Sequence, residues 1–380
     1  MPASGANRHP AAVQALLTDF CRAPVAVERW ERLEPWAVAR VHLGGAGAGR
    51  TVIVKWVRTG PAQARTEPWR LHTEMAALQF LSDDLGFALA PRVIAADMSA
   101  GFLVLEDLAP RVALDHLIRR DGAAACLELL AVFARARGEL SAATAGQAGT
   151  YLARCAAPGS PAGGAESRLA GLWDQGHKDA AALGAPIAGP AASELIAALE
   201  ELNAPGPFLA LSNGDAESNN ILVHESGPAD ARLIDFEAAG YAHALIDAVC
   251  LHVPGPGWIS VGDPGAAGLA DQYRSALARG VPEAQDDRRY GFALAAACMS
   301  WALLRLDRFA VLDTRAPGDH SRLQLVETLE SAARTAEAHR ALPHLAGWAR
   351  RTADVLRRRW PDADLDLTDW ARFPPYSPRR

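Results

Sequence analysis

Two short polar segments hold the residues that are best suited to chemistry in this chain. Residues 213–220 read Asn-Gly-Asp-Ala-Glu-Ser-Asn-Asn, and residues 235–237 read Asp-Phe-Glu. The neighbouring segments 208–211, 221–223 and 232–234 predict short strands, and a Ser-Gly-Pro turn separates the last two. Two carboxylates and one amide would therefore sit at the ends of one hairpin, where they can hold a divalent metal and orient a nucleophile.

The spacing of these side chains suggests a particular reaction. Asn220 follows Asp215 by five residues, and Asp235 follows it by twenty. Phosphoryl transfer from a nucleotide requires the protein to orient an acceptor hydroxyl and to hold magnesium on the phosphates. One carboxylate accepts the hydroxyl proton, while an amide oxygen and a second carboxylate bind the hard cation. Asp215, Asn220 and Asp235 supply this set.

Lysine is rare in this chain. Of its 38 basic residues only Lys55 and Lys178 are lysine. Lys55 lies inside the apolar segment 51–57, whose weak alternation is typical of a strand covered on both faces. On the helix predicted at 67–81, Glu74 falls on the same stripe as the leucines. A lysine inside an apolar strand, where the chain otherwise chooses arginine, indicates a chemical role.

The first part of the chain predicts a small antiparallel sheet with one helix, ending near Asp107. Residues 44–49 are rich in glycine but lack the lysine of a phosphate-binding loop, and no helix follows them. We therefore expect a hairpin turn there. The strands are expected at 27–33, 38–43, 51–57, 91–94 and 102–106.

The rest of the chain predicts mainly helices. A loop rich in glycine, proline and alanine is expected at 156–164, and irregular structure at 360–380. The helices are expected at 123–144, 192–202, 243–252, 264–279, 287–310, 321–338 and 346–360.

Length and composition limit the classes of protein. With 380 residues, half of them hydrophobic, the chain can form two lobes with cores of their own. A net charge of −6, a pI of about 6.0 and the lack of a basic stripe argue against nucleic-acid binding. Five scattered cysteines predict neither a disulfide framework nor a zinc site, and they fit a reducing cytoplasm.

No membrane association is expected from the sequence. The first 24 residues lack the apolar core of a secretory signal. The longest apolar run, residues 291–304, is too short to span a membrane and predicts a buried helix.

The two polar segments resemble a known family. Asn213 to Asn220, together with Ile234-Asp235-Phe236-Glu237, is similar to the catalytic and metal loops of the aminoglycoside phosphotransferase and choline kinase family. The resemblance covers roughly residues 27–251, and the two-part motif with its spacing carries it.

The resemblance implies a fold and an activity. The fold would be α+β and protein-kinase-like, with a small antiparallel-sheet N-lobe over 1–106 and a larger, mainly helical C-lobe over 107–380. The activity would be that of a small-molecule kinase, which transfers the γ-phosphate of ATP or GTP, with Mg²⁺, to a hydroxyl of a small-molecule acceptor.

The resemblance also implies roles for individual residues. Asp215 would be the catalytic aspartate, and Asn220 and Asp235 would be the magnesium ligands. Lys55 would contact the nucleotide phosphates and pair with Glu74. That pairing also has a physical basis, because a buried ammonium and a carboxylate on an apolar helix face each need a partner.

Further roles concern the backbone between the lobes and the support of the catalytic loop. Leu105, Glu106, Asp107 and Leu108 would form a hinge whose backbone groups meet the edge of the nucleotide base. Asp247 matches a family aspartate that braces the catalytic loop.

The sequence departs from the family at three places. Asn213 stands where the family usually has histidine, and Ser141 stands where it often has another. Asn213 can still hydrogen-bond the loop, which predicts a structural substitution. Residues 33–36, expected to lie over the phosphates, contain no glycine, so backbone amides are not expected to cradle phosphate there.

Each candidate also has an ordinary interpretation. The polar cluster would then consist of turn residues at hairpin ends, and Lys55 would be an edge lysine that reaches solvent. Two other functions remain open, namely a non-catalytic nucleotide-binding protein of the same fold and a metal-dependent hydrolase. The combination of Lys55 and Glu74 argues against the hydrolase, which has no need of a distant lysine.

The acceptor is not determined by the sequence, since aminoglycosides, choline-like alcohols, sugars, amino-acid hydroxyls and macrolides all occur in this group. Glu217 is a candidate to face the acceptor. Trp258, Tyr273 and Trp301 would line an acceptor pocket or belong to the core. A cationic acceptor would need an acidic pocket, for which the candidates are Asp263, Asp271, Asp286, Asp287, Asp307 and Asp313.

Overall fold

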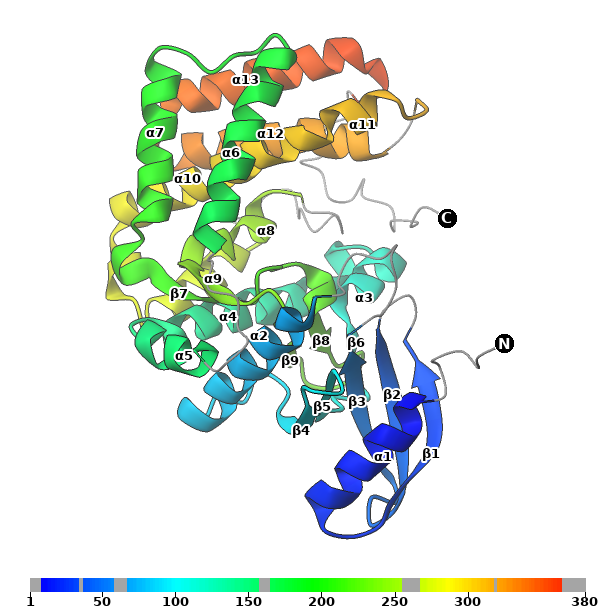
Figure 1. The fold of residues 1–380 in the computed structure, drawn as a ribbon. Helices are drawn as coiled ribbons and strands as arrows, with labels where there is room; N and C mark the ends of the chain where they lie inside the picture. The colour runs from blue at the N-terminus through cyan, green and yellow to red at the C-terminus, as the bar shows by residue number, and fades with distance from the viewer. Residues whose placement is uncertain are drawn as a thin grey trace. The chain divides into compact units, whose positions relative to one another are not determined.

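The chain divides into two compact units, which we describe separately. Unit 1 comprises residues 1–110, 149–161 and 232–239, and unit 2 comprises 111–148, 162–231 and 240–380. In Figure 1 the colour runs from the blue strands and helix of unit 1 to the orange and red helices of unit 2. The computed structural model describes residues 8–33, 37–57, 67–156, 165–254, 267–317 and 320–363.

Unit 1 is built on an antiparallel sheet in the order β1-β2-β3-β5-β4. All five predicted strands are present, with ends shifted by a few residues. The predicted glycine turn joins β2 to β3, and Gly45 and Gly49 have φ of +63° and +76°, a region that glycine enters without strain. The strands are β1 (Val25–Arg32), β2 (Val38–Gly45), β3 (Arg50–Trp56), β4 (Val93–Asp97) and β5 (Phe102–Glu106).

One face of this sheet packs against helix α1 (Arg8–Cys21), which was not expected from the sequence. Val13 and Leu17 of α1 are buried in one cluster with Val52 and Val54 of β3. Successive residues of a strand point to opposite faces, so Lys55, which follows Val54, points away from this cluster. The α1 side of the sheet is therefore structural, and the other side carries the lysine.

Helix α2 (Pro68–Gln79) supplies the predicted partner of the lysine. Its first residue is proline, which favours a helix start because its missing N–H is not needed there. Leu71, Glu74 and Leu78 form its buried stripe. The helix predicted at 67–81 is confirmed, and it continues as a π-helical turn over Phe80–Asp84.

A later segment of the chain also belongs to unit 1 and brings Asp235 with it. The amide of Leu233 donates to the carbonyl of Leu89 at 2.7 Å. The hydroxyl of Tyr151 donates to the carbonyl of Ala239 at 3.2 Å, and its ring packs edge-on against Phe80. These contacts hold both ends of the segment 232–239 on unit 1.

Unit 2 is mainly helical, and α10 lies at its centre. This helix packs against α6, α7, α12 and α13, and its alanines from Ala293 to Ala297 are buried (Figure 1). The buried helix predicted at 291–304 is therefore confirmed. The helices of unit 2 are α3 (Leu114–Asp121), α4 (Leu127–Thr144), α6 (Ala165–Ala182), α7 (Pro190–Asn203), α8 (Val249–His252), α9 (Leu269–Leu277), α10 (Asp287–Arg305), α11 (Phe309–Asp313), α12 (His320–Ala338) and α13 (Pro343–Arg359).

Two strand pairs position the polar segment 213–220 within unit 2. Strand β7 (Leu209–Ser212) pairs with β10 (Gly240–His243), and β6 (Val112–Ala113) pairs with β8 (Ile221–Val223). The segment 213–220 runs from the end of β7 to the start of β8, as the sequence predicts. β9 (Ala231–Leu233) ends two residues before Asp235.

The sequence analysis was wrong about the helix at 243–252. Only α8 is α-helical there, because β10 pairs with β7 and a 3₁₀ turn follows at Ala244–Ile246. Cross-strand pairing thus overrides the local helical pattern. Helices α3, α5 (Ala148–Cys155) and α6 were not expected. The loop predicted at 156–164 and the segment 360–380 lie almost wholly outside the described residues.

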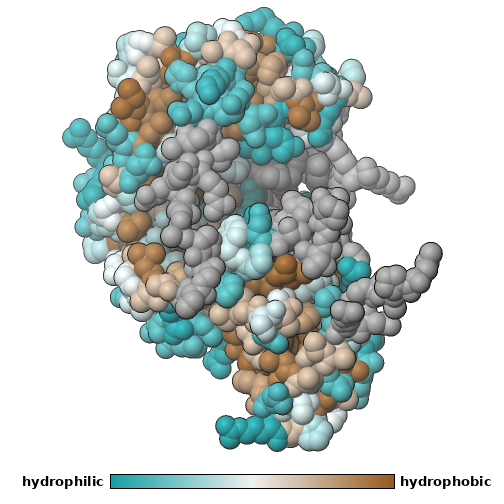
Figure 2. All heavy atoms as spheres, in the orientation of Figure 1, coloured by the Kyte–Doolittle hydropathy of each residue, from teal (hydrophilic) through white to brown (hydrophobic). Residues whose placement is uncertain are grey.

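Figure 2 shows hydrophilic residues spread widely over the face that it draws, with apolar residues in smaller groups. Among the described residues, no helix combines the length and the apolar character that a membrane span requires.

Close helix packing in unit 2 gives a stability prediction. A Cβ on Gly138 of α4 would lie 2.4 Å from the backbone oxygen of Tyr273 in α9, so a backbone must shift. Gly138→Ala should lower the free energy of unfolding by about 1–3 kcal/mol, as overpacked sites do. Denaturant unfolding measures the change.

The control is Gly149→Ala in α5, where nothing lies within 4 Å of the new Cβ. This variant should be neutral or slightly more stable, because alanine favours a helix over glycine. Equal stability changes in the two variants would contradict the packing of α4 on α9.

Candidate active site

Lys55 is held between two carboxylates in unit 1. Its Nζ donates to Glu74 Oε1 at 2.7 Å and to Asp235 Oδ1 at 2.8 Å. Burial alone would lower the pKa of Lys55, but the charges of Asp235 and Glu74 outweigh it and hold that pKa above its ordinary value. The predicted pairing of Lys55 with Glu74 is confirmed, and Asp235 shares the same ammonium.

Glu74 is a fully buried carboxylate whose two oxygens differ in their hydrogen bonds. Burial raises its pKa, and the charge of Lys55 opposes that rise. Oε1 also accepts the amide of Phe236 at 3.3 Å, whereas Oε2 has no hydrogen-bond partner in the part of the chain that the structure describes. Because a buried ionised carboxylate needs compensation, Lys55 is the group that permits Glu74 to stay charged.

The backbone at Asp235 is in an uncommon conformation. Its φ is +62°, in the left-handed region that residues other than glycine rarely adopt. Such outliers persist where the surrounding contacts enforce them, and they are concentrated at functional sites. The contacts here are the bond from Lys55 to the Asp235 carboxylate and the bond from Phe236 to Glu74.

In unit 2, a buried arginine fixes the start of the other polar segment. Arg137 of α4 is fully buried, and its Nη1 donates to Asn213 Oδ1 at 2.7 Å. The same oxygen accepts the amide of Asp215 at 3.4 Å. Asn213 therefore hydrogen-bonds the loop, as predicted for the residue that replaces the family histidine.

Asp247 supports the same loop from the other side. Ser212 Oγ donates to Asp247 Oδ1 at 2.5 Å and accepts the amide of Gly214 at 2.9 Å. Burial raises the pKa of Asp247, and the charge of Arg137, 3.8 Å from its Oδ2, opposes the rise. The position of Asp247 agrees with the bracing role that the resemblance implies.

Sequence reasoning missed Arg137, although the chain carries a signal for it. Phe133, Arg137 and Ser141 recur at intervals of four residues along α4, and all three are buried. A basic residue on an apolar helix stripe needs a partner, just as Lys55 does.

Asn220 closes the loop on itself. Its Nδ2 donates to the carbonyl of Asp215 at 2.9 Å, and its amide donates to the carbonyl of Glu217 at 3.1 Å. Its Oδ1 accepts Asn219 Nδ2 at 2.9 Å. Because an amide oxygen has two lone pairs, Oδ1 keeps one for a further donor or a cation.

Glu217 is buried within this loop. Its Oε2 has no hydrogen-bond partner among the described residues. Burial and the nearby Asp215 raise the pKa of Glu217 to about 7, against the opposing charges of Arg305 and Arg137. Its suggested contact with an acceptor stays a prediction.

The donor set is compatible with magnesium. Among the described residues, no group of three or more histidine, cysteine, aspartate or glutamate side chains is arranged as a metal site. Magnesium usually takes one or two carboxylates and fills its other positions with phosphate oxygens and water. One amide and one carboxylate, as in Asn220 and Asp235, fit that pattern.

In the hinge expected at residues 105–108, the side chain of Asp107 is bonded to other residues of unit 1. Arg40 donates to both oxygens of Asp107, at 2.7 and 3.2 Å, and Ala109 donates its amide to the same carboxylate. The amide of Glu106 already donates to the carbonyl of Arg92 at 2.9 Å, so it is not free for a nucleotide base. A role for the remaining backbone of Leu105, Asp107 and Leu108 stays a prediction.

The structure thus groups the predicted residues in two sets. Lys55, Glu74 and Asp235 meet in unit 1, whereas Asp215 and Asn220 share one loop of unit 2. Residues 34–36 of the predicted phosphate-covering loop, like Trp258 and Asp263, lie outside the described residues. Tyr273 is a core residue whose hydroxyl donates to the carbonyl of Ala244.

A sheet unit with a shared lysine and a helical unit with a braced aspartate–asparagine loop define a kinase-like phosphotransferase. The sequence matches the model of the phosphotransferase enzyme family (APH) over residues 31–292, more than half of its length. The chain therefore belongs to this family, and the predicted bilobal α+β fold is confirmed. It is a phosphotransferase that acts on a hydroxyl group of a small molecule.

Solved structures resemble the chain at low identity. A choline kinase from Streptococcus pneumoniae is 12% identical, covering 85% of this chain and 98% of its own, with a TM-score of 0.42. A macrolide 2'-phosphotransferase from Brachybacterium faecium is 16% identical, covering 83% and 97%, with a TM-score of 0.47. No curated protein matches the sequence.

The shared lysine gives a prediction about stability and pH. Lys55→Met would leave the buried carboxylate of Glu74 and the half-buried carboxylate of Asp235 without their cation, which should lower the free energy of unfolding by about 3–5 kcal/mol near pH 8. The pKa of Glu74 is already raised, so the loss should shrink as the pH falls toward 5 and the carboxylates take up protons.

Lys178→Met is the matched control, because this is the only other lysine and it lies exposed on α6. Its unfolding free energy should stay within about 0.5 kcal/mol of the parent at every pH. A loss in Lys55→Met that is as small as in the control, or that is the same at pH 8 and pH 5, would contradict the arrangement.

Proposed function

We propose that this phosphotransferase transfers the γ-phosphate of ATP or GTP to a hydroxyl of a small-molecule acceptor in a magnesium-dependent reaction. The observation that supports the proposal best is the sharing of Lys55 between Glu74 and Asp235. An ammonium fixed by two carboxylates is suited to a phosphate oxygen and keeps its charge at neutral pH. A hydrolase that acts without a nucleotide would have no use for it.

In this proposal the phosphates and the metal are bound by groups that the fold has already oriented. Lys55 contacts phosphate oxygens, and Glu74 prevents its ammonium from turning away. Asp235 and Asn220 bind Mg²⁺, which when bound neutralises charge on the phosphates. The left-handed backbone at Asp235 sets the direction of its carboxylate.

Asp215 is proposed to accept the proton of the acceptor hydroxyl. Its backbone is fixed at both ends, because Asn213 accepts its amide and Asn220 donates to its carbonyl. A base held in this way needs no rearrangement to meet a bound hydroxyl, and positioning supplies much of the rate in such reactions.

The neighbouring structures suggest small alcohols as acceptors. One of them is a choline kinase and another is a macrolide 2'-phosphotransferase. For the acceptor of this chain we propose only what these proteins have in common, a hydroxyl group on a small molecule. The co-substrate is ATP or GTP. The base of this nucleotide would lie beside the backbone of Leu105–Leu108.

Removal of the proposed base gives the test of this function. Asp215→Ala should lower kcat by about 10² or more, the usual effect of losing a general base, with little change in nucleotide affinity. A nucleotide-consumption assay against an alcohol library identifies the acceptor first. Asp174→Ala, an exposed aspartate on α6, is the control and should keep full turnover.

Two results would count against the proposal. Full turnover by Asp215→Ala would remove this residue from the reaction. Magnesium-dependent nucleotide binding without product from any alcohol would instead favour a non-catalytic nucleotide-binding protein.

A further inference from the structure

A small cavity with two arginines lies in unit 2, at the end of α10. Its volume is about 170 Å³, below the roughly 300–1,000 Å³ of pockets for drug-sized ligands. It therefore suits one chemical group of a ligand better than a whole large ligand. The lining residues are Arg305, Arg308, Leu312, Ser321, Gln324, Leu325 and Thr328.

Neither arginine forms an ion pair within the described residues, and the opposing charges of Asp307 and Glu217 still leave the pKa of Arg305 below its ordinary value. Among the described residues, the side chains of Arg305 and Arg308 form no hydrogen bond and no ion pair, and none of the lining residues is acidic. The guanidinium of Arg305 lies over the ring of Trp301, 5.7 Å from its centre. Burial and the like charge of Arg308 lower the pKa of Arg305.

This pair is unlike other arginines nearby. Arg359 binds both oxygens of Asp313, and Arg350 and Arg357 bind Glu330. Two half-buried guanidinium groups at one cavity without a counter-ion are electrostatically unfavourable. An anion that enters the cavity would relieve this repulsion and would accept planar, paired hydrogen bonds.

The cavity is electrostatically linked to the catalytic loop. The charge of Arg305 acts on Glu217, which lies two residues after Asp215, and Glu217 acts on Arg305 in return. Both residues belong to unit 2. A ligand group bound at Arg305 therefore lies in the electrostatic range of the loop that carries the proposed base.

Three of the six acidic residues that were candidates to attract a cationic acceptor already have partners in the protein. Asp286 accepts the amides of Arg288 and Arg289 as the N-cap of α10. Asp287 pairs with Arg274 at 2.7 Å, and Asp313 pairs with Arg359 at 2.6 Å. None of these carboxylates lines the cavity at Arg305.

We propose that the cavity lined by Arg305 and Arg308 binds a carboxylate or phosphate group of the acceptor, which makes the acceptor an anionic hydroxy compound. This inference rests on the proposed function and specifies its substrate class. Arg305 and Arg308 then select the acceptor by its anionic group. Asp215 accepts the proton from the hydroxyl of the same acceptor molecule.

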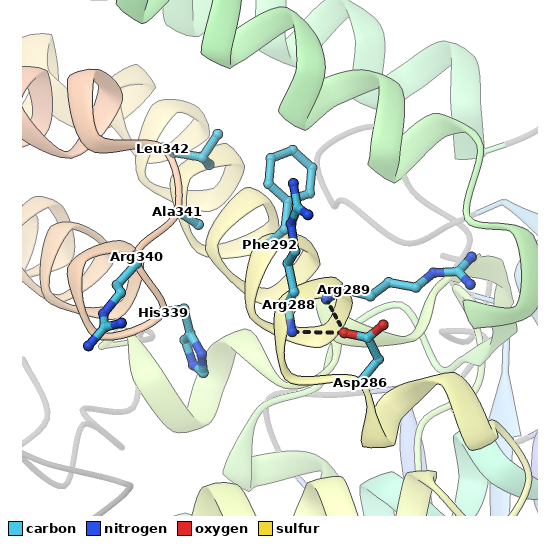
Figure 3. Close-up of a pocket in the computed structure, with 8 residues that line it drawn as sticks. All are labelled: Asp286, Arg288, Arg289, Phe292, His339, Arg340, Ala341 and Leu342. Carbon is cyan, nitrogen blue, oxygen red and sulfur yellow. Dashed lines mark hydrogen bonds between the residues drawn. The ribbon is translucent and has the colours of Figure 1, made fainter.

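A second arginine-lined hollow offers the matched control. It has a volume of about 440 Å³ and is lined by Arg288, Arg289, Arg340 and His339, among others (Figure 3). It differs because its arginines are exposed and because Asp286, whose bonds to two backbone amides are dashed in Figure 3, places a carboxylate there. We assign no ligand to it.

The test compares four acceptors that share a three-carbon hydroxyl skeleton. These are glycerol, glycerate, glycerol 3-phosphate and 3-amino-1,2-propanediol, which are neutral, carboxylate, phosphate and cationic. The rate of nucleotide consumption with glycerate or with glycerol 3-phosphate should exceed the rate with glycerol by at least about tenfold. A comparison of the two anionic compounds then identifies which anion is preferred. Calorimetry with glycerate and with inorganic phosphate measures binding without turnover.

Substitutions of single arginines test whether the anion binds at Arg305 and Arg308. Arg305→Gln and Arg308→Gln should weaken binding of the preferred anion, and raise KM for its acceptor, by about tenfold or more, the factor that corresponds to 1.4 kcal/mol. Arg340→Gln should bind like the parent. Arg305→Lys should keep part of the affinity, and thermal unfolding shows whether each variant is folded.

The outcomes separate this inference from the proposed function. If neutral or cationic alcohols are phosphorylated and Arg305→Gln leaves their KM unchanged, the inference is wrong and the function stands. If neither anion binds the parent protein, or if all variants bind equally, the cavity is not an anion site. If the anion binds through Arg305 but no alcohol in a wide library consumes nucleotide, the proposed function fails and the anion site is supported.

Discussion

The structure of the site depends on one ammonium, that of Lys55, whose side chain is only 14% exposed. Lys55 lies on a strand whose opposite face is filled by α1, and its charge is shared by carboxylates from α2 and from the segment 232–239. Glu74 is fully buried, so its ionised form is tolerated only with that cation nearby. Lys55 therefore joins three separate segments of unit 1 in one arrangement, and the same charge is suited to phosphate.

Unit 2 uses a buried cation in a comparable way. Arg137 contacts Asn213 and lies beside Asp247, and these two residues hold the loop of Asp215 by its side chains and amides. Each unit thus fixes a carboxylate of the candidate site through a basic residue, which is partly buried in unit 1 and fully buried in unit 2. Arg305 and Arg308 differ, because no carboxylate of the described residues pairs with them, and this contrast motivates an anionic acceptor.

Much of this arrangement could be predicted from the sequence, because burial forces charged residues to find partners. Lys55 and Glu74 stand out as charges in apolar surroundings, and their pairing, which the family resemblance implies, agrees with that need for partners. Arg137 carried the same signal but was hidden among 38 basic residues. Helix α1 and strand β10 could not be predicted, because α1 is fixed by packing on the sheet and β10 by pairing with β7, and neither partner is visible in the local pattern.

The most direct test of the shared ammonium is a double-mutant cycle on the free energy of unfolding, with Lys55→Met, Glu74→Gln and the double variant. Removal of Lys55 leaves the buried Glu74 without its cation, and Glu74→Gln leaves Lys55 with Asp235 alone, so the double variant should be less destabilised than the sum of the single changes. We expect a coupling energy of about 1–3 kcal/mol, which is usual for contacting charged groups. Additivity within about 0.5 kcal/mol would contradict the account, because it would mean that Lys55 and Glu74 do not depend on each other.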